Sequence, residues 1–219
     1  EYVIILSGDQ ICKQDYADFL RFHKEKGAEF SVAVMEVDWK EASRFGLMVA
    51  DEDDRITEFQ EKPPVPKSNL ASMGIYIFNW DILKKYLEED EADPNSKNDF
   101  GMNIIPALLR DGRKMYAYHF NGYWRDVGTI DSLWEANMEV LDPENSGIDI
   151  FDEKWKIYSR NPVLPAQKIG PRALVQDSLV TEGCQIYGCV KHSVLSAGVV
   201  VEEGATVEDA VLMDGVVVK

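Results

Sequence analysis

The sequence lacks any apolar run that approaches the roughly 18 to 20 residues needed to cross a bilayer, and no signal-type segment opens it. Basic residues are also scarce, because 23 lysines and arginines stand against 39 aspartates and glutamates and leave a formal net charge of −16. A surface this acidic repels nucleic-acid backbones and anionic lipids. We therefore expect a cytoplasmic protein that binds neither nucleic acid nor membranes.

Cysteine is rare as well. The three cysteines, Cys12, Cys184 and Cys189, form no CxxC pair and have no histidine at zinc-binding spacing. We expect reduced thiols and no structural metal. The 219 residues, 45% of them hydrophobic, are nevertheless enough for one core with a small additional module.

The first residues predict the start of an α/β sheet. Residues 1–6 are an apolar run typical of a buried parallel strand, which also suggests that the natural protein has residues before Glu1. An amphipathic helix is predicted at 15–26, with His23 at the edge of the core, and a buried strand at 30–37. Strand, helix and strand in this order are typical of a βαβ unit in a parallel sheet.

Asp9 follows directly after the first predicted strand. In open α/β sheets, ligands gather outside the carboxyl ends of the strands. Asp9 is therefore a candidate contact for a metal ion or a substrate. The alternative is an aspartate that caps the next turn.

Two short strands are predicted at 47–49 and 56–59, around an acidic turn, and a third at 74–78. Glu61 and Lys62 follow the second strand and are stopped by two prolines, so the pair is held at a strand end. Glutamate accepts hydrogen bonds from hydroxyls, and lysine donates them to hydroxyls or phosphate, so the pair suits a phosphorylated polyol. The alternative is an exposed ion pair beside a proline turn.

The rest of the α/β region alternates between helix and strand patterns. We predict helices at 81–87, 103–110 and 130–141, with Asp81 as the N-cap of the first, a polar loop at 88–98 and a strand at 114–120.

The stretch GYWRDVGT at 122–129 combines two aromatic residues with a second candidate carboxylate, Asp126. The aromatic pair could wall a sugar ring, while Asp126 precedes a tight Val127-Gly128 turn. The alternative is a packed aromatic corner with an ion pair between Arg125 and Asp126.

From Ile169 the helical pattern gives way to an internal repeat. Its copies are LVTEGCQI at 179–186, VLSAGVVV at 194–201 and VLMDGVVV at 211–218, with starts 15 and 17 residues apart. This spacing is close to that of a coil made of about three six-residue rungs per turn, and it predicts a left-handed parallel β-helix. Such coils bury their aliphatic residues only by stacking, so we expect more coils after Lys219.

The composition changes near Tyr158, which divides the chain into two predicted domains. Residues 1–157 are predicted to form an incomplete, mostly parallel Rossmann-like α/β domain. Residues 158–219 are predicted to form a truncated β-helix domain.

Six segments carry a resemblance to a known family. They are SGDQICK at 7–13, RFG at 44–46, FQEKP at 59–63, SMGIYIF at 72–78, DFG at 99–101 and YWRDVGT at 123–129. In this order, followed by hexad repeats, they resemble the bacterial glucose-1-phosphate adenylyltransferases (ADP-glucose pyrophosphorylases) across essentially the whole chain. The EKP element is common among sugar nucleotidyltransferases, whereas the SMGIYIF and YWRDVGT pair is more specific to the ADP-glucose branch.

The resemblance implies an α/β nucleotidyltransferase domain coupled to a C-terminal β-helix. It implies an enzyme that joins ATP and α-D-glucose 1-phosphate and releases pyrophosphate, in glycogen synthesis. The implied partners are these two substrates and further subunits, in a homotetramer or in a hetero-oligomer with a related subunit. The implied cofactor is Mg²⁺.

The resemblance also implies roles for individual residues. The implied contacts to glucose 1-phosphate are Gly46, Glu61, Lys62, Ser72 and Trp124, with Lys62 on the phosphate. The implied magnesium ligands are Asp9 and Asp126, and the implied catalytic set is Asp9, Lys62 and Asp126. This chemistry needs a cation between carboxylates because the attacking and departing groups are both anionic.

The chain departs from the family pattern in three places. The family's Gly-rich loop, which grips the ATP triphosphate, lies upstream of the matching region and has no counterpart here, so we expect the chain by itself to be inactive. Cys12 stands where an aromatic residue is usual. Met102-Asn103 replaces a lysine-containing pair after DFG, which removes a lysine expected near the phosphates.

Two other functions remain open from the sequence. One is a nucleotidyltransferase for another sugar phosphate or base. The other is a non-catalytic regulatory subunit of the same family. The retention of Asp9, Lys62 and Asp126 argues against a regulatory subunit, because a chain freed from chemistry has no physical need for two metal-holding carboxylates.

Overall fold

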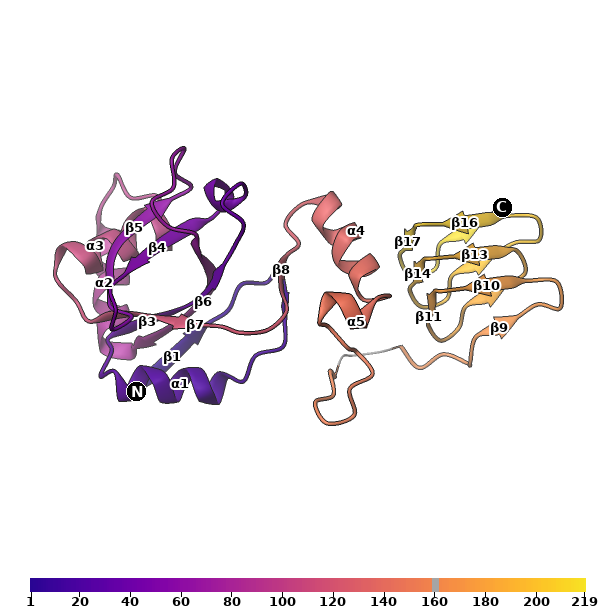
Figure 1. Cartoon of the computed structure of the whole chain (residues 1–219), viewed down its shortest axis with the longest axis horizontal. Coiled ribbons are helices and arrows are strands. Elements are labelled where there is room, and N and C mark those ends of the chain that lie inside the picture. The colour runs from indigo at the N-terminus through magenta and orange to yellow at the C-terminus, as the bar shows by residue number, and fades with distance from the viewer. Residues whose placement is uncertain (159–161) are drawn as a thin grey trace. The chain divides into compact units, whose positions relative to one another are not determined.

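The computed structural model describes residues 1–158 and 162–219 (Figure 1). The chain divides into two compact units, one made of residues 1–8 and 13–122 and the other of residues 9–12 and 123–219. Each unit has its own hydrophobic core. Among the described residues, no helix is long and apolar enough to cross a membrane.

The first unit is built on a six-stranded sheet. Its strands are β1 (Tyr2–Ile5), β3 (Phe30–Glu36), β4 (Gly46–Ala50), β5 (Ile56–Glu61), β6 (Leu70–Asn79) and β7 (Met115–His119). The order is β5-β4-β6-β3-β7, and β1 pairs with the C-terminal half of β6 while β4 pairs with its N-terminal half. The predicted strands are therefore confirmed at the expected places.

The sheet is mixed, which corrects the expectation of a mostly parallel sheet. Strands β3 and β7 run parallel, whereas β6 runs antiparallel to β1, β3 and β4. Because β6 lies between β1 and β3, these two strands point in the same direction without being neighbours. The βαβ pattern correctly predicted that β1 and β3 run in the same direction. It did not show that β6, a later strand, lies between them. The prediction that residues 1–6 form a buried parallel strand is also wrong for the described residues, because Tyr2 and Ile4 are exposed and β6, the strand that β1 pairs with, is antiparallel to it.

Helix α1 (Tyr16–Glu25) begins after Asp15, whose carboxylate accepts a hydrogen bond from the Ala17 N–H at 2.8 Å. Its His23 is completely buried and does not lie at the edge of the core as predicted. Nδ1 of His23 lies 2.8 Å from Ser31 Oγ, and Nε2 lies 3.2 Å from Asn79 Oδ1. Burial lowers the pKa of His23, so a neutral ring connects the helix to β3 and β6.

Helix α2 (Trp80–Ala92) is longer than predicted. Asn79 occupies the N-cap position, so Asp81 lies in the first turn and is not the cap. The segment 88–92, expected in a loop, continues the helix, and ion pairs at Lys84–Glu88 and Lys85–Glu89 add a small stabilisation across one helical turn.

The remaining helical elements of this unit are short. A 3₁₀ turn at Ala42–Arg44 precedes β4, and a π-helical turn at Phe100–Ile104 leads into α3 (Ile105–Arg110). The helix predicted at 103–110 is thus present, but its first turn is wound as a π-helix. The sheet, α2 and α3 bury a common core that includes Phe30, Phe78 and Leu108.

The second unit starts from an antiparallel pair, β2 (Gln10–Cys12) with β8 (Trp124–Asp126). Helices α4 (Ile130–Glu139) and α5 (Pro143–Ser146) follow. The capping box of Thr129 and Ser132 starts α4. The helix predicted at 130–141 is confirmed apart from its last two residues.

The repeat region forms a parallel β-solenoid, seen as stacked short arrows in Figure 1. Its strands are β9 (Lys168–Ile169), β10 (Leu174–Gln176), β11 (Leu179–Val180), β12 (Gln185–Ile186), β13 (Cys189–Lys191), β14 (Val194–Leu195), β15 (Val200–Val201), β16 (Thr206–Glu208), β17 (Val211–Leu212) and β18 (Val217–Val218). Leu179, Val194 and Val211 stack in register, as the repeat predicts, and the interior is a separate apolar core. The predicted domain boundary at 157/158 stays a prediction, and residues 159–161 of that region lie outside the described residues.

Candidate functional site

Glu61 is the centre of one group of candidate residues, in the first unit. It ends β5 and lies opposite Gly46, the first residue of β4. A Cβ added at Gly46 would lie 3.0 Å from Glu61 Oε2, and one added at Gly101 would lie 2.7 Å from the same oxygen. Both approaches are closer than an ordinary contact, so a side chain at either position would displace the Glu61 carboxylate from its place against the backbone.

The electrostatics around Glu61 are those of a partly buried carboxylate. Burial raises the pKa of its carboxyl group, the Lys62 ammonium acts in the opposite direction, and Asp99 adds to the increase. Lys62 Nζ lies 3.8 Å from Glu61 Oε1, with 66% of the lysine side chain exposed. The exposed ammonium leaves room for an anionic ligand beside the glutamate.

Lys62 is held in an unusual backbone conformation. Its φ angle is 43°, in the left-handed region that residues other than glycine rarely adopt. Its N–H donates to the Phe45 carbonyl at 3.2 Å, which ties the position to the start of β4. Residues held in this way often lie at binding sites, where the rest of the fold maintains the strained conformation.

Ser72 lies on β6 beside an irregularity in the ladder with β3. Gly74, with φ of 67°, occupies the irregularity and donates its N–H to Ser72 Oγ at 3.2 Å. The Ser72 side chain is also hydrogen-bonded with Tyr76, whose pKa is raised by burial and by the charges of Glu61 and Asp99. The structure therefore brings Ser72 and Glu61 to the same group of side chains.

Three members of this group were not assigned a role from the sequence: Tyr76, Asp99 and Gly101. Asp99 accepts the Met102 N–H at 2.8 Å and starts the π-helical turn that carries Gly101 to Glu61. All three lie inside the SMGIYIF and DFG segments, so the sequence already pointed to the parts of the chain that carry them. Which positions of those segments turn toward Glu61 could not be known from their spacing.

Asp9 and Asp126 form a second group, in the second unit. Asp126 ends β8 opposite Gln10, and the Val127 N–H donates to the Asp9 carbonyl at 2.9 Å. A Cβ added at Gly128 would lie 3.0 Å from Asp126 Oδ1 and 3.5 Å from Asp9 Oδ2. Since both oxygens lie near that one point, the structure places the two predicted carboxylates side by side.

An ion-pair network fixes the strand that carries Asp126. Arg125 contacts Glu139 through two hydrogen bonds, and the Tyr123 hydroxyl donates to the same carboxylate at 2.6 Å. Burial acts to raise the pKa of Glu139, but the bonds from Arg125 and Tyr123 lower it. The alternative ion pair between Arg125 and Asp126 is therefore wrong. Asp126 instead accepts the Gly128 N–H at 2.9 Å.

Trp124 is buried, with 9% of its surface exposed, and its indole N–H donates to Gln10 Oε1 at 3.1 Å. These contacts hold the β2–β8 pair together. The role of Trp124 as a wall of a sugar site stays a prediction.

The carboxylate pair offers oxygen ligands of the kind that a magnesium ion prefers. Among the described residues, no group of three or more His, Cys, Asp or Glu side chains could hold a metal. Magnesium is often bound through only one or two carboxylates together with substrate phosphates, at about 2.0–2.1 Å. Asp9 and Asp126 fit that smaller set of protein ligands.

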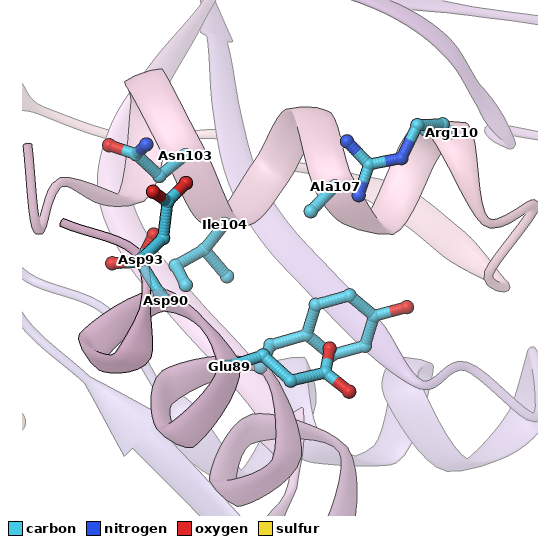
Figure 2. A pocket seen from close by; sticks show the side chains of 8 residues that line it. Glu89, Asp90, Asp93, Asn103, Ile104, Ala107 and Arg110 are labelled. Carbon is cyan, nitrogen blue, oxygen red and sulfur yellow. The ribbon is translucent and has the colours of Figure 1, made fainter. Parts of the chain in front are cut away.

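Two cavities of the first unit have walls made largely of other residues. One of about 160 Å³ lies between α2 and α3, and Figure 2 shows Glu89, Asp90 and Arg110 among its lining side chains. A second, of about 330 Å³, includes Asp99 and Phe100 in its wall. None of the residues predicted as site residues lines either cavity.

Comparison with known proteins gives two family matches. A nucleotidyl transferase family model matches residues 1–143, and a model of a GlmU-like C-terminal hexapeptide domain matches residues 164–219.

Three curated relatives are each named glucose-1-phosphate adenylyltransferase. The protein of Desulforamulus reducens is 56% identical over 99% of this chain, that of Clostridium beijerinckii 61% over 96%, and that of Bacillus cereus 58% over 98%. The matched regions cover 54%, 54% and 57% of these relatives, so the chain spans about half the length of the curated relatives it matches. Because the first model covers well over half of the chain, this protein belongs to the nucleotidyl transferase family.

Proposed function

We propose that this chain is part of a glucose-1-phosphate adenylyltransferase. The reaction transfers AMP from ATP to α-D-glucose 1-phosphate and yields ADP-glucose and pyrophosphate, in glycogen synthesis. The observation that carries the proposal is the shared name of relatives that are 56–61% identical over nearly the whole chain. In this reaction an oxygen of the sugar phosphate bonds to the α-phosphorus of ATP, and the bond from that phosphorus to pyrophosphate breaks.

The Glu61 group is proposed to bind glucose 1-phosphate. The Glu61 carboxylate accepts hydrogen bonds from sugar hydroxyls, and its closeness to Gly46 and Gly101 lets the sugar approach the backbone. The Lys62 ammonium bonds the phosphate, and its exposure leaves it accessible to that ligand. Ser72, hydrogen-bonded with Tyr76, offers a further hydroxyl group to the sugar.

Asp9 and Asp126 are proposed to hold Mg²⁺. The ion, when bound, supplies positive charge to the α-phosphate of ATP during the displacement. The two carboxylates are held in place by the β2–β8 pairing, by the Val127-Gly128 turn and by the network around Arg125. The protein therefore provides a rigid pair of oxygen ligands and no nucleophile of its own.

The assembly and the location of the natural protein are also proposals. We propose a homotetramer, or a hetero-oligomer with a related subunit, in the cytoplasm, and ATP as the second substrate. The names of the relatives support the substrates.

Calorimetric titration of the 219-residue chain with sugar 1-phosphates tests the proposal. Glucose 1-phosphate should bind more tightly than galactose 1-phosphate, mannose 1-phosphate or N-acetylglucosamine 1-phosphate. In the natural protein, ATP with glucose 1-phosphate should release pyrophosphate, whereas this chain by itself should release none. Preference for another sugar 1-phosphate, or for UTP over ATP, would contradict the proposal and identify the protein as a related nucleotidyltransferase.

A further inference from the structure

The two faces of strand β8 are held by different partners. Successive side chains of a strand point to opposite faces, so Trp124 and Asp126 share one face and Arg125 lies on the other. Trp124 is buried, and its indole N–H donates to Gln10 Oε1 at 3.1 Å. The face that carries Asp126 is therefore fixed through β2.

Glu139, the last residue of α4, holds the opposite face. Its Oε2 accepts hydrogen bonds from the Tyr123 hydroxyl at 2.6 Å and from Arg125 Nε at 3.1 Å, and its Oε1 contacts Arg125 Nη2. The side chains of Arg125 and Glu139 are 34% and 27% exposed. A two-point contact between a guanidinium and a carboxylate is both strong and directional, so it fixes the orientation of Arg125.

The helix that supplies Glu139 begins directly after the turn that follows Asp126. Thr129, the N-cap of α4, starts the helix with a capping box. Within the turn, the Gly128 N–H donates to Asp126 Oδ1 at 2.9 Å. The segment around Asp126 is thus held before the turn by the contact between Arg125 and Glu139, and after the turn by the helix cap.

A second acidic residue of α4 contacts the same arginine in a weaker way. Glu135 Oε2 lies 3.9 Å from Arg125 Nη1, and the Glu135 side chain is 51% exposed. This distance exceeds that of a hydrogen bond, so Glu135 attracts the guanidinium without orienting it. Glu135 therefore provides a matched control for Glu139.

We propose that Glu139 is a positioning residue for the magnesium site: through Arg125 and Tyr123 it sets the course of β8, and with it the place of the Asp126 carboxylate beside Asp9. The inference rests on the proposed metal role of these two aspartates. Groups that orient metal ligands from behind typically change metal affinity about 10- to 100-fold when they are replaced. The effect of Glu139 passes through the backbone of β8.

Manganese binding to the 219-residue chain, followed by NMR, tests the proposal. Mn²⁺ shares the preference of Mg²⁺ for carboxylate oxygens, and it broadens the signals of nearby amides, so the Gly128 amide reports binding at the turn. Glu139→Gln keeps the size of the side chain, but it removes the charge and turns one acceptor into a donor. The manganese concentration that half-broadens the Gly128 signal should rise about tenfold or more in this variant.

Two further variants calibrate this result. Glu135→Gln should raise the same concentration by less than about twofold, because exposed ion pairs contribute little. Tyr123→Phe removes one hydroxyl donor and keeps the ring, so it should raise the concentration roughly threefold, in line with the loss of one hydrogen bond. It takes the place of Glu139→Gln if that variant does not fold.

Urea unfolding of the same variants separates positioning from stability. If Glu139→Gln lowers the free energy of unfolding and leaves the manganese titration of the folded protein unchanged, Glu139 has a structural role only and the proposal is overturned. Equal manganese affinities of Glu139→Gln and Glu135→Gln would overturn it as well. Absence of broadening at Gly128 in the unaltered chain would reject the metal role of Asp9 and Asp126, and the inference with it.

Discussion

Replacing Lys62 by alanine removes the ammonium group proposed to contact the phosphate of glucose 1-phosphate. The Lys62 side chain is 66% exposed and its Nζ lies 3.8 Å from Glu61 Oε1, so the ion pair contributes at most about 1 kcal/mol to stability. A charge-assisted contact to a phosphate is worth about 1.5–3 kcal/mol, which corresponds to a roughly 10- to 150-fold increase in Kd. Binding should therefore weaken far more than folding.

The contribution of Lys62 to binding, through its ammonium group, can be separated from its effect on stability, through its strained backbone. Alanine keeps the Cβ and therefore keeps the strain of the left-handed conformation at φ of 43°. Lys62→Gly relieves about 1 kcal/mol of that strain and removes the same ammonium group. The glycine variant should thus bind glucose 1-phosphate as weakly as the alanine variant, while its free energy of unfolding is higher.

Calorimetric titration with glucose 1-phosphate, together with urea unfolding, measures both quantities. Lys67→Ala is the matched control, because the Lys67 side chain is 61% exposed and pairs with Glu58 at 2.7 Å. In the natural protein, Lys62→Ala should raise the KM for glucose 1-phosphate far more than the KM for ATP. Equal Kd values for the Lys62 and Lys67 variants, or equal effects on both substrates, would refute the phosphate contact.

Three further predictions concern other parts of the structure. Asp126→Asn should lower the maximal rate of the natural protein and shift its magnesium dependence, while its thermal midpoint stays unchanged. Asp131→Asn is the control. A lowered midpoint with unchanged magnesium dependence would contradict the metal role. Gly101→Ala places a Cβ 2.7 Å from Glu61 Oε2 and should therefore displace the carboxylate. Glucose 1-phosphate binding, measured by calorimetric titration, should weaken by about 0.5–1.5 kcal/mol. Unchanged affinity would exclude the proposed contact. His23 has a folded-state pKa below that of the unfolded chain, so its contribution to stability is present above about pH 6.5 and is lost as pH falls. Urea unfolding between pH 5 and 7.5 should show this loss, and His23→Gln should make the pH dependence shallower; identical slopes would argue against it.

Several features of the candidate site could be predicted from the sequence because they depend on short segments. Glu61 and Lys62 were identified from their place between a strand and two prolines, and Asp9 from its place after an apolar strand. Their neighbours Tyr76 and Asp99 could not be assigned, because an irregularity in β6 and the π-helical turn decide which side chains turn toward Glu61.

The sequence by itself determined the solenoid, since each copy of the repeat pairs in register with the next and the aliphatic pattern of one coil specifies that of its neighbours. It also determined where most helices and strands of the α/β unit lie, because these depend on local periodicity. Only the tertiary structure decided the order and direction of the strands. The insertion of β6 between β1 and β3, and the neighbour or free edge that each strand then has, arise from pairing between residues far apart in the chain, which no local pattern encodes.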